Sequence, residues 1–153
     1  MRYVLPFAVF LVALAAYAQS GSPPKLRFLN PPAIATPTGY THVVEVNRGR
    51  LVYISGQVAL DKSGAVVGKG DFKAQVTQVF ENLKAAVEAA GGTMADVAKI
   101  NTYAVDVSQL QALREVRSTY FTGNPPASTL VQVVRLAREE FLVEIEAVAV
   151  IGK

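Results

Sequence analysis

The stretch LVEIEAVAVI, residues 142–151, carries two glutamates at alternate positions within an otherwise apolar run. This period of two predicts a β-strand whose successive side chains face opposite sides of a sheet. One side carries only apolar and small residues and suits a packed core. The other side carries Glu144 and Glu146 among apolar residues, which fits neither a free surface nor a sealed core. We therefore expect this second side to line a polar cleft at a subunit interface.

Two segments upstream have helical periodicity and can cover the apolar side of that strand. From residue 71 onward, apolar side chains recur at steps of three and four. They are Phe72, Val76, Val79, Phe80, Leu83, Val87 and Ala90. Asp71 is suited to cap this helix, and the glycines at 91–92 are suited to end it. A second helix is expected over 110–120, with Ser108 and Gln111 as its capping box.

Further strands are expected on either side of these helices. Runs rich in β-branched residues at 43–46 and 51–58 flank a turn that contains Gly49, which predicts an antiparallel hairpin. Strands are also expected over 97–105 and 129–134. Because a helix lies between consecutive strands, right-handed crossovers and parallel pairs follow. These elements predict one α+β domain, which agrees with the length of 153 residues.

The amino-terminal part differs in composition from the rest of the chain. A basic start, an apolar run and the sequence Ala-Tyr-Ala at 16–18 form the pattern of a secretory signal. We expect residues 1–18 to be removed before Gln19, residues 19–29 to form a flexible lead-in, and residues 30–153 to form the domain. The apolar run is short for a membrane helix, so an uncleaved anchor is the less favoured alternative. The sequence thus predicts an exported protein, periplasmic or secreted, without a stable membrane anchor.

Composition argues against several classes of site. The chain has 15 Lys+Arg against 12 Asp+Glu, and its net charge of +3 is spread without a basic run, so no nucleic-acid partner is expected. It has no cysteine and one histidine, which excludes a His/Cys metal cluster and a cysteine nucleophile. That histidine, His42, is interpreted as a surface residue. The glycines within 64–70 lack the spacing and the hydroxyl residue of a phosphate loop.

A series of short segments resembles one known family in the order of the segments and in their amino-acid sequences. They are PPA at 31–33, GY at 39–40, YISGQ at 53–57, DKSG at 61–64, DFKAQ at 71–75, ENL at 81–83, AAG at 89–91, PASTLV at 126–131 and VEIEAVAV at 143–150. Together they look like the RidA (YjgF) family of reactive-intermediate deaminases. The resemblance implies a chorismate-mutase-like α+β fold, a mixed sheet with two helices on one face, and a homotrimer with clefts between subunits. It also implies hydrolysis of enamine or imine acids such as 2-aminoacrylate to keto acids and ammonia, without metal or organic cofactor.

Matching positions carry the family's site residues onto this chain. The resemblance implies that Tyr40 lines the small-molecule cleft, that Ser55 and the Gly56 backbone border it, and that Glu144 activates the attacking water. A carboxylate suits that role because it accepts a proton as water adds to the imine carbon. Structural alternatives stand beside these roles: an ion pair for Glu144, a tight strand end for Ser55, and interface packing for Tyr40. Glu146 is interpreted as the partner of an arginine or a lysine.

The chain departs from the family pattern at one position of the predicted cleft. In PAS, residues 126–128, Ser128 stands where the deaminating members carry an arginine that grips the substrate carboxylate. Serine offers one neutral donor in place of two charge-assisted hydrogen bonds. We therefore expect weak binding of 2-aminoacrylate, unless Arg135 or Arg138 reaches the cleft. Arg135 fits equally well as the partner of Glu146.

Three functions follow from the sequence, in descending order. The first is a RidA-like protein that binds a small molecule and hydrolyses an enamine or imine compound. The second is a non-catalytic, exported trimer that binds a ligand in the same cleft. The third, ribonuclease activity or inhibition of translation, ranks last because the chain has neither a basic groove nor a histidine pair for acid-base chemistry.

Overall fold

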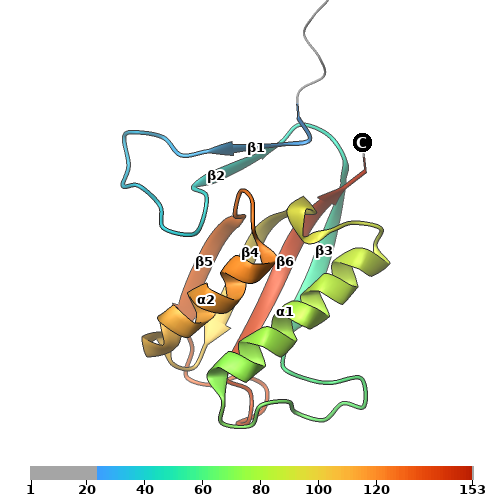
Figure 1. Ribbon diagram of the computed structural model, residues 1–153, viewed down its shortest axis with the longest axis vertical. Helices are drawn as coiled ribbons and strands as arrows, with labels where there is room; N and C mark the ends of the chain where they lie inside the picture. Colours follow the sequence, from blue (N-terminus) through green and yellow to red (C-terminus); the bar gives the residue numbers. More distant parts are fainter. Residues whose placement is uncertain (1–23, 153) are drawn as a thin grey trace, which may run out of the picture.

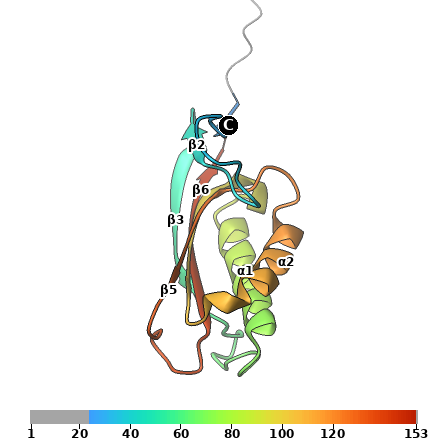
Figure 2. The same ribbon diagram turned by 90° about the vertical axis from the view of Figure 1, so that its left-hand side faces the viewer.

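The computed structural model describes residues 24–152. Its strands are β1 (Leu26–Leu29), β2 (Val43–Val46), β3 (Arg50–Gln57), β4 (Val97–Ala104), β5 (Ala127–Gln132) and β6 (Val143–Ile151). Its helices are α1 (Phe72–Ala89) and α2 (Leu110–Tyr120), with short 3-10 turns η1 (Met94–Asp96) and η2 (Val107–Gln109). The main sheet has the strand order β3-β6-β4-β5, and β1 pairs with β2 in a second sheet at one end of it (Figure 1). Figure 2 shows both helices on one face of the main sheet.

Helix α1 forms as its periodicity predicts. The Asp71 side chain accepts a hydrogen bond from the Ala74 backbone N–H at 3.0 Å and so caps the first turn. At the other end Gly91 takes a φ of +85°, a conformation that costs a glycine little. The apolar stripe between these caps is buried against the sheet, with Val76, Val79 and Phe80 fully inside. This helix therefore closes one side of the core.

Strand β6 is one of the two central strands of the sheet. It pairs antiparallel with both β3 and β4, so its backbone is satisfied on both edges. The apolar set predicted from its alternation lies in the core beneath the helices. That set is Val143, Ile145, Ala147, Ala149 and Ile151. The opposite set, which carries both carboxylates, lies on the face that the helices leave open.

The second helix and its flanking strands lie where the sequence predicts them, but the cap at the start of the helix differs from the predicted one. Helix α2 connects β4 to β5, which pair in parallel as expected. The capping box predicted from Ser108 and Gln111 is wrong, because η2 precedes the helix. Asp106 instead accepts hydrogen bonds from the backbone N–H of Ser108 at 2.8 Å and from its hydroxyl at 2.8 Å. A charged acceptor just upstream outcompetes a serine hydroxyl for the free amides at the start of the turn.

Two of the predicted strand pairings are wrong. Strands β2 and β3 do not form a hairpin: β2 pairs with β1, and β3 pairs with β6. Gly49 between them takes a positive φ of +107° and turns the chain from one sheet into the other. Strands β3 and β4 run parallel without pairing, because β6 lies between them. Local patterning cannot reveal that a later segment inserts between two earlier strands.

Strand β1 lies within residues 19–29, the segment expected to be a lead-in. Its residue Leu26 packs with Ala98 and Val150 in a second, smaller apolar cluster. Lys25, just before the strand, forms an ion pair with Asp96 at η1. The β1-β2 sheet therefore covers one end of the open face, and the two carboxylates of β6 lie beyond its reach.

The predicted signal segment, residues 1–18, lies outside the described residues. Within residues 24–152, no helix is both long enough and apolar enough to cross a membrane.

Candidate functional site

Glu144 lies against the backbone of strand β3. The pairing of β3 with β6 shifts register between Ile54 and Gln57, so Ser55 and Gly56 form a bulge opposite the carboxylate-bearing part of β6. A Cβ atom placed on Gly56 would come within 2.0 Å of the Glu144 Oε1 atom. The carboxylate therefore occupies the space that a side chain at position 56 would need. Ser55, Gly56 and Glu144, three of the predicted site residues, are neighbours in one subunit.

Glu146 is held by two neutral donors from strand β4. Its Oε1 atom accepts hydrogen bonds from the Asn101 amide at 2.7 Å and from the Tyr103 hydroxyl at 3.2 Å. No salt bridge within residues 24–152 includes Glu146, so the ion pair expected with an arginine or lysine is not found there. Hydrogen bonding to Glu146, burial, and the negative charges of Glu146 and Glu144 raise the pKa of Tyr103. The phenol thus stays protonated and serves as a donor.

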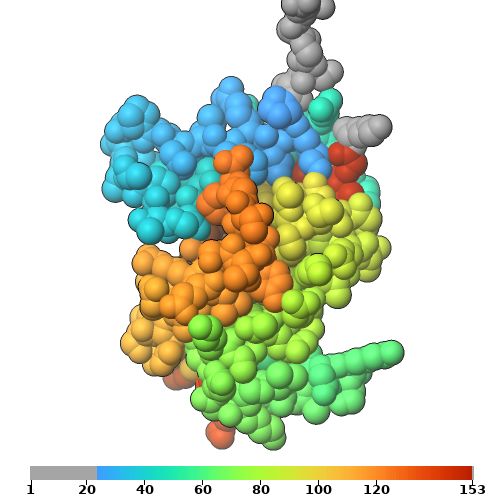
Figure 3. Space-filling view, viewed as in Figure 1, coloured from blue at the N-terminus to red at the C-terminus, as the bar shows by residue number. Residues whose placement is uncertain are grey.

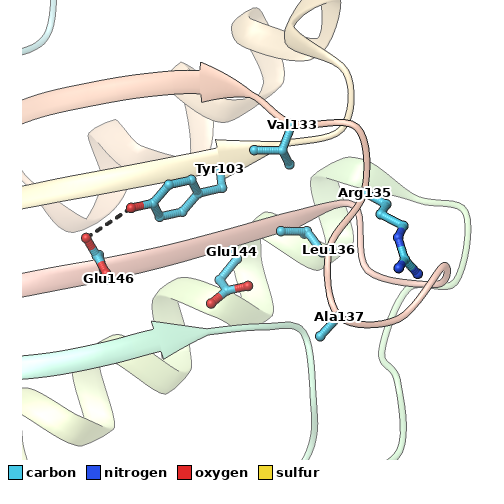
Figure 4. Close-up of a pocket in the computed structure, with 7 residues that line it drawn as sticks. All are labelled: Tyr103, Val133, Arg135, Leu136, Ala137, Glu144 and Glu146. Carbon is cyan, nitrogen blue, oxygen red and sulfur yellow. Dashed lines mark hydrogen bonds between the residues drawn. The ribbon is translucent and has the colours of Figure 1, made fainter.

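An open hollow of about 570 Å³ lies over this part of the sheet. Its lining residues are Tyr103, Val133, Arg135, Leu136, Ala137, Glu144 and Glu146. Figure 4 shows Glu144 pointing toward β3 and the Tyr103 hydroxyl pointing toward Glu146. Two carboxylates and a phenol facing one hollow can bind a small polar molecule and can accept a proton from water. Among the salt bridges within residues 24–152, none includes Glu144, so the alternative of an ion pair is not supported.

The two arginines considered as replacements for the family's arginine lie differently. Arg135 lines the hollow from the loop between β5 and β6, but its guanidinium points away from both carboxylates (Figure 4). Arg138 lies with its guanidinium carbon 5.3 Å from the centroid of the buried Phe141 ring. That cation-π contact holds Arg138 to the core edge. Of the two, only Arg135 borders the hollow.

Tyr40 and Ser128 form a separate group at the other edge of the sheet. Tyr40 lies in the loop between β1 and β2, and Thr41 beside it donates its N–H to the Pro126 carbonyl at 3.1 Å. Ser128 follows on the edge strand β5, in register with the core residue Ile100. Paired residues share a face, so Ser128 faces the helix side and not the Glu144 hollow. Within one subunit, these two residues do not join the other three.

Three residues on the open face were missed by sequence reasoning. Asn101 and Tyr103 hold Glu146, and Lys99 donates a hydrogen bond to the Thr129 hydroxyl at 2.5 Å. Burial lowers the pKa of Lys99. Their alternation along β4 with Ile100, a core residue, was the signal that could have found them. Lys99 and Asn101 border a second hollow together with Tyr53 and Ser55.

Metal ligation finds no support in the described part of the chain. Within residues 24–152, no group of three His, Cys, Asp or Glu side chains could hold a metal ion. His42 lies with its Nε2 atom 2.7 Å from the Ala35 carbonyl oxygen and edge-on to the Tyr40 ring, at a centroid distance of 5.3 Å. It acts there as an anchor of the β1-β2 loop.

Comparison with known proteins identifies the family. The family whose model matches residues 31–151 is described as Endoribonuclease L-PSP. The chain belongs to this family, the RidA (YjgF) family. A RutC family protein of Pyrococcus horikoshii is 39% identical over 104 residues, which are 68% of this chain and 82% of that protein. The family membership predicted from the short segments is therefore confirmed.

Solved structures of RidA-family proteins share the fold. A Rid family protein of unknown function from Yersinia pestis is 38% identical with a TM-score of 0.78, and the match covers 83% of this chain and 99% of that one. RidA from the Antarctic bacterium Psychrobacter is 41% identical with a TM-score of 0.63, covering 76% of this chain and 92% of the other. The predicted α+β fold, with a mixed sheet and two helices, is confirmed.

Proposed function

We propose that this protein binds a small imine or enamine in a cleft between subunits of a homotrimer and hydrolyses it to a carbonyl compound and ammonia. One observation carries the proposal. The Glu144 carboxylate lies on the bare backbone of Gly56, beside a bulge and facing an open hollow. A carboxylate without an ion-pair partner in the described chain is free to accept a proton.

The reaction needs only water and one proton-transferring group. Water adds to the carbon of the protonated imine while Glu144 accepts a proton from it, which gives a neutral carbinolamine. The protonated Glu144 then returns this proton to nitrogen. The C–N bond breaks and ammonia leaves, while the hydroxyl proton of the carbinolamine passes to Glu144 and the carbonyl forms. An enamine is first protonated on carbon, which gives the same protonated imine. Glu146, held by Asn101 and Tyr103, adds negative charge and fixed polar groups beside the reacting atoms.

A neighbouring subunit is proposed to complete the cleft. Tyr40 and Ser128 lie apart from Glu144 within one chain, near the β5 edge of the sheet. A second copy whose β5 edge approaches the open face can bring its own Tyr40 and Ser128 to the hollow. The open face has the apolar surface that such packing needs. Leu51 is 49% exposed and Tyr53 is 77% exposed on it.

Ser128 shapes the expected substrate range. A lost hydrogen bond to a charged group costs about 1.5 to 3 kcal/mol, or roughly 10- to 150-fold in affinity. We therefore expect weak activity on 2-aminoacrylate and stronger activity on imines whose binding does not depend on a contact between an arginine and a substrate carboxylate. No metal or organic cofactor is required by this scheme.

The test is release of ammonia from freshly generated imines by the purified protein. We expect acceleration over buffer, and a loss of about 100-fold or more in Glu144→Gln, because that variant keeps the shape of the side chain and removes the base. Glu88→Gln, an exposed change on α1, serves as the matched control. No acceleration with any of several imines would reject the catalytic proposal.

A non-catalytic ligand-binding trimer is the second candidate, and Ser128 favours it because the usual carboxylate grip is absent. Calorimetry with the same compounds separates the two: saturable binding without ammonia release supports a binding protein. We also propose that the chain is exported. A measured mass that corresponds to a chain beginning at Gln19 would support export.

Ribonuclease activity, which is named in the family description, ranks below both the catalytic and the binding function. RNA cleavage abolished in Glu144→Gln would reverse this order.

A further inference from the structure

On the helix side of the molecule, a buried arginine has no acidic partner within residues 24–152. Arg117 on α2 is only 9% exposed. Within residues 24–152, its guanidinium takes part in none of the salt bridges and none of the side-chain hydrogen bonds. Burial lowers the pKa of Arg117, and the nearby charge of Arg114 lowers it further. No carboxylate is among these causes, which agrees with the salt bridges within residues 24–152.

The acidic residue of α2 is already engaged elsewhere. Glu115 is the one carboxylate among the residues of α2, and it accepts a hydrogen bond from Lys73 at 2.8 Å. That pair ties α2 to α1, whereas Arg114 and Arg117 line a pocket beside the loops at Gly39 and Pro125. The helix therefore supplies two positive charges to this pocket and no negative one.

The pocket has the size and the polar lining of a small-anion site. Its volume is about 360 Å³. Its lining residues are Thr38, Gly39, Arg114, Arg117, Ser118, Phe121, Gly123 and Pro125. The guanidinium of Arg117 lies against Gly39, where a Cβ atom would come within 2.7 Å of its NH2 group. Figure 3 shows the blue-to-cyan segment that contains Gly39 next to the orange residues that end α2.

We propose that Arg114 and Arg117 form a binding site for a small oxyanion of the phosphate or carboxylate type. An unpaired buried charge is costly, and an oxyanion offsets that cost through charge-assisted, paired hydrogen bonds to the planar guanidinium. The hydroxyl groups of Thr38 and Ser118 border the same pocket. Because α2 covers the face opposite Glu144, the site lies outside the proposed imine cleft of its own subunit and goes beyond that function.

The experiment is calorimetric titration with inorganic phosphate at constant ionic strength, repeated with acetate. We expect saturable binding of at least one anion, and whichever binds more tightly identifies the chemical type. Arg117→Ala and Arg114→Ala should each weaken binding roughly tenfold or more. Arg48→Ala, an exposed change that also removes one positive charge, should bind like the wild type.

Several outcomes would overturn this proposal. One is the absence of saturable binding for both anions. Another is an anion affinity that is unchanged in both Arg117→Ala and Arg114→Ala. Because Arg114 is exposed, its substitution should not disturb folding, so Arg114→Ala still tests the proposal if Arg117→Ala does not fold. A third is a change in oligomer mass in Arg117→Ala with anion binding intact, which would make a neighbouring subunit's carboxylate the missing partner. Arg114→Ala should lose anion binding while ammonia release from imines stays at the wild-type rate, which separates this site from the proposed catalytic one.

Discussion

A methyl group at position 56 would stand where the Glu144 carboxylate lies. The distance from such a Cβ to Glu144 Oε1 is 2.0 Å, far inside van der Waals contact. We predict that Gly56→Ala lowers imine hydrolysis, or ligand affinity if the protein only binds, by at least about tenfold, because the base is displaced. Stability should change little, since the group that must move is the free end of a side chain. Steady-state kinetics and thermal unfolding together check both parts.

Gly123→Ala is the matched control for that change. A Cβ at Gly123 meets no atom within 4 Å, and its φ is not positive, so neither a clash nor strain is expected. If Gly56→Ala proved as active as Gly123→Ala, the position of the Glu144 carboxylate against the Gly56 backbone would not be required for activity.

The sequence could place some site residues and not others, for reasons visible in their contacts. Glu144 and Gly56 belong to short local motifs, and the two strands that carry them pair directly, so their neighbourhood was predictable. The partner of Glu146 was not, because Asn101 and Tyr103 are uncharged and lie on a strand more than forty residues upstream. A search for opposite charges overlooks amide and phenol donors.

At the scale of elements, one ion pair joins the small sheet to the main one. Desolvation alone would raise the pKa of Asp96, but hydrogen bonds from Lys25 and Thr93 and the Lys25 charge outweigh it and lower the pKa below its ordinary value of 3.8. A carboxyl with a depressed pKa in the folded state stabilises the fold above its unfolded pKa and stops doing so as the pH falls through the folded value. We predict that Asp96→Asn lowers the free energy of unfolding by about 1 kcal/mol at neutral pH.

Urea unfolding at several pH values measures this contribution. The gap between wild type and Asp96→Asn should be full near neutrality and should close as the pH drops below about 4. Glu88→Gln provides the control, because its partner Lys84 is 3.9 Å away and both side chains are exposed. A gap that stayed constant down to acid pH would assign the effect to packing of η1 instead of to the charge.

Some elements and pairings are determined by residues close in sequence, and others by segments that are distant in sequence. Helix α1 and strand β6 were predictable because their periods and caps lie within their own residues. The hairpin of β2 with β3 was predicted wrongly because the real partners, β1 and β6, lie earlier and much later in the chain. Short strands with similar β-branched composition carry no signal that selects one partner over another.

For the whole molecule, the uncovered face of the sheet predicts association. Figure 2 shows helices on one side only. Tyr53 is 77% exposed and pairs with Val148 of β6, which places it on the other side. We predict that the protein is a trimer in solution and that Tyr53→Glu dissociates it, because a buried unpaired carboxylate at an interface is costly. Light scattering after gel filtration measures the mass. Ala85→Glu on the outer side of α1 should leave the trimer intact, and a monomeric wild type would contradict the prediction.

A trimer with shared clefts makes a stronger prediction about mixtures of inactive variants. If Glu144 comes from one subunit and Tyr40 from the next, a cleft is whole whenever the first subunit carries an intact Glu144 and the second an intact Tyr40. Glu144→Gln and Tyr40→Ala would each be inactive alone. Refolded together in equal amounts, they should recover about a quarter of the wild-type imine hydrolysis, because chance assembly gives one intact cleft in about four. Mixing without refolding is the control. No recovery in fully mixed trimers would place both residues in the cleft of a single subunit.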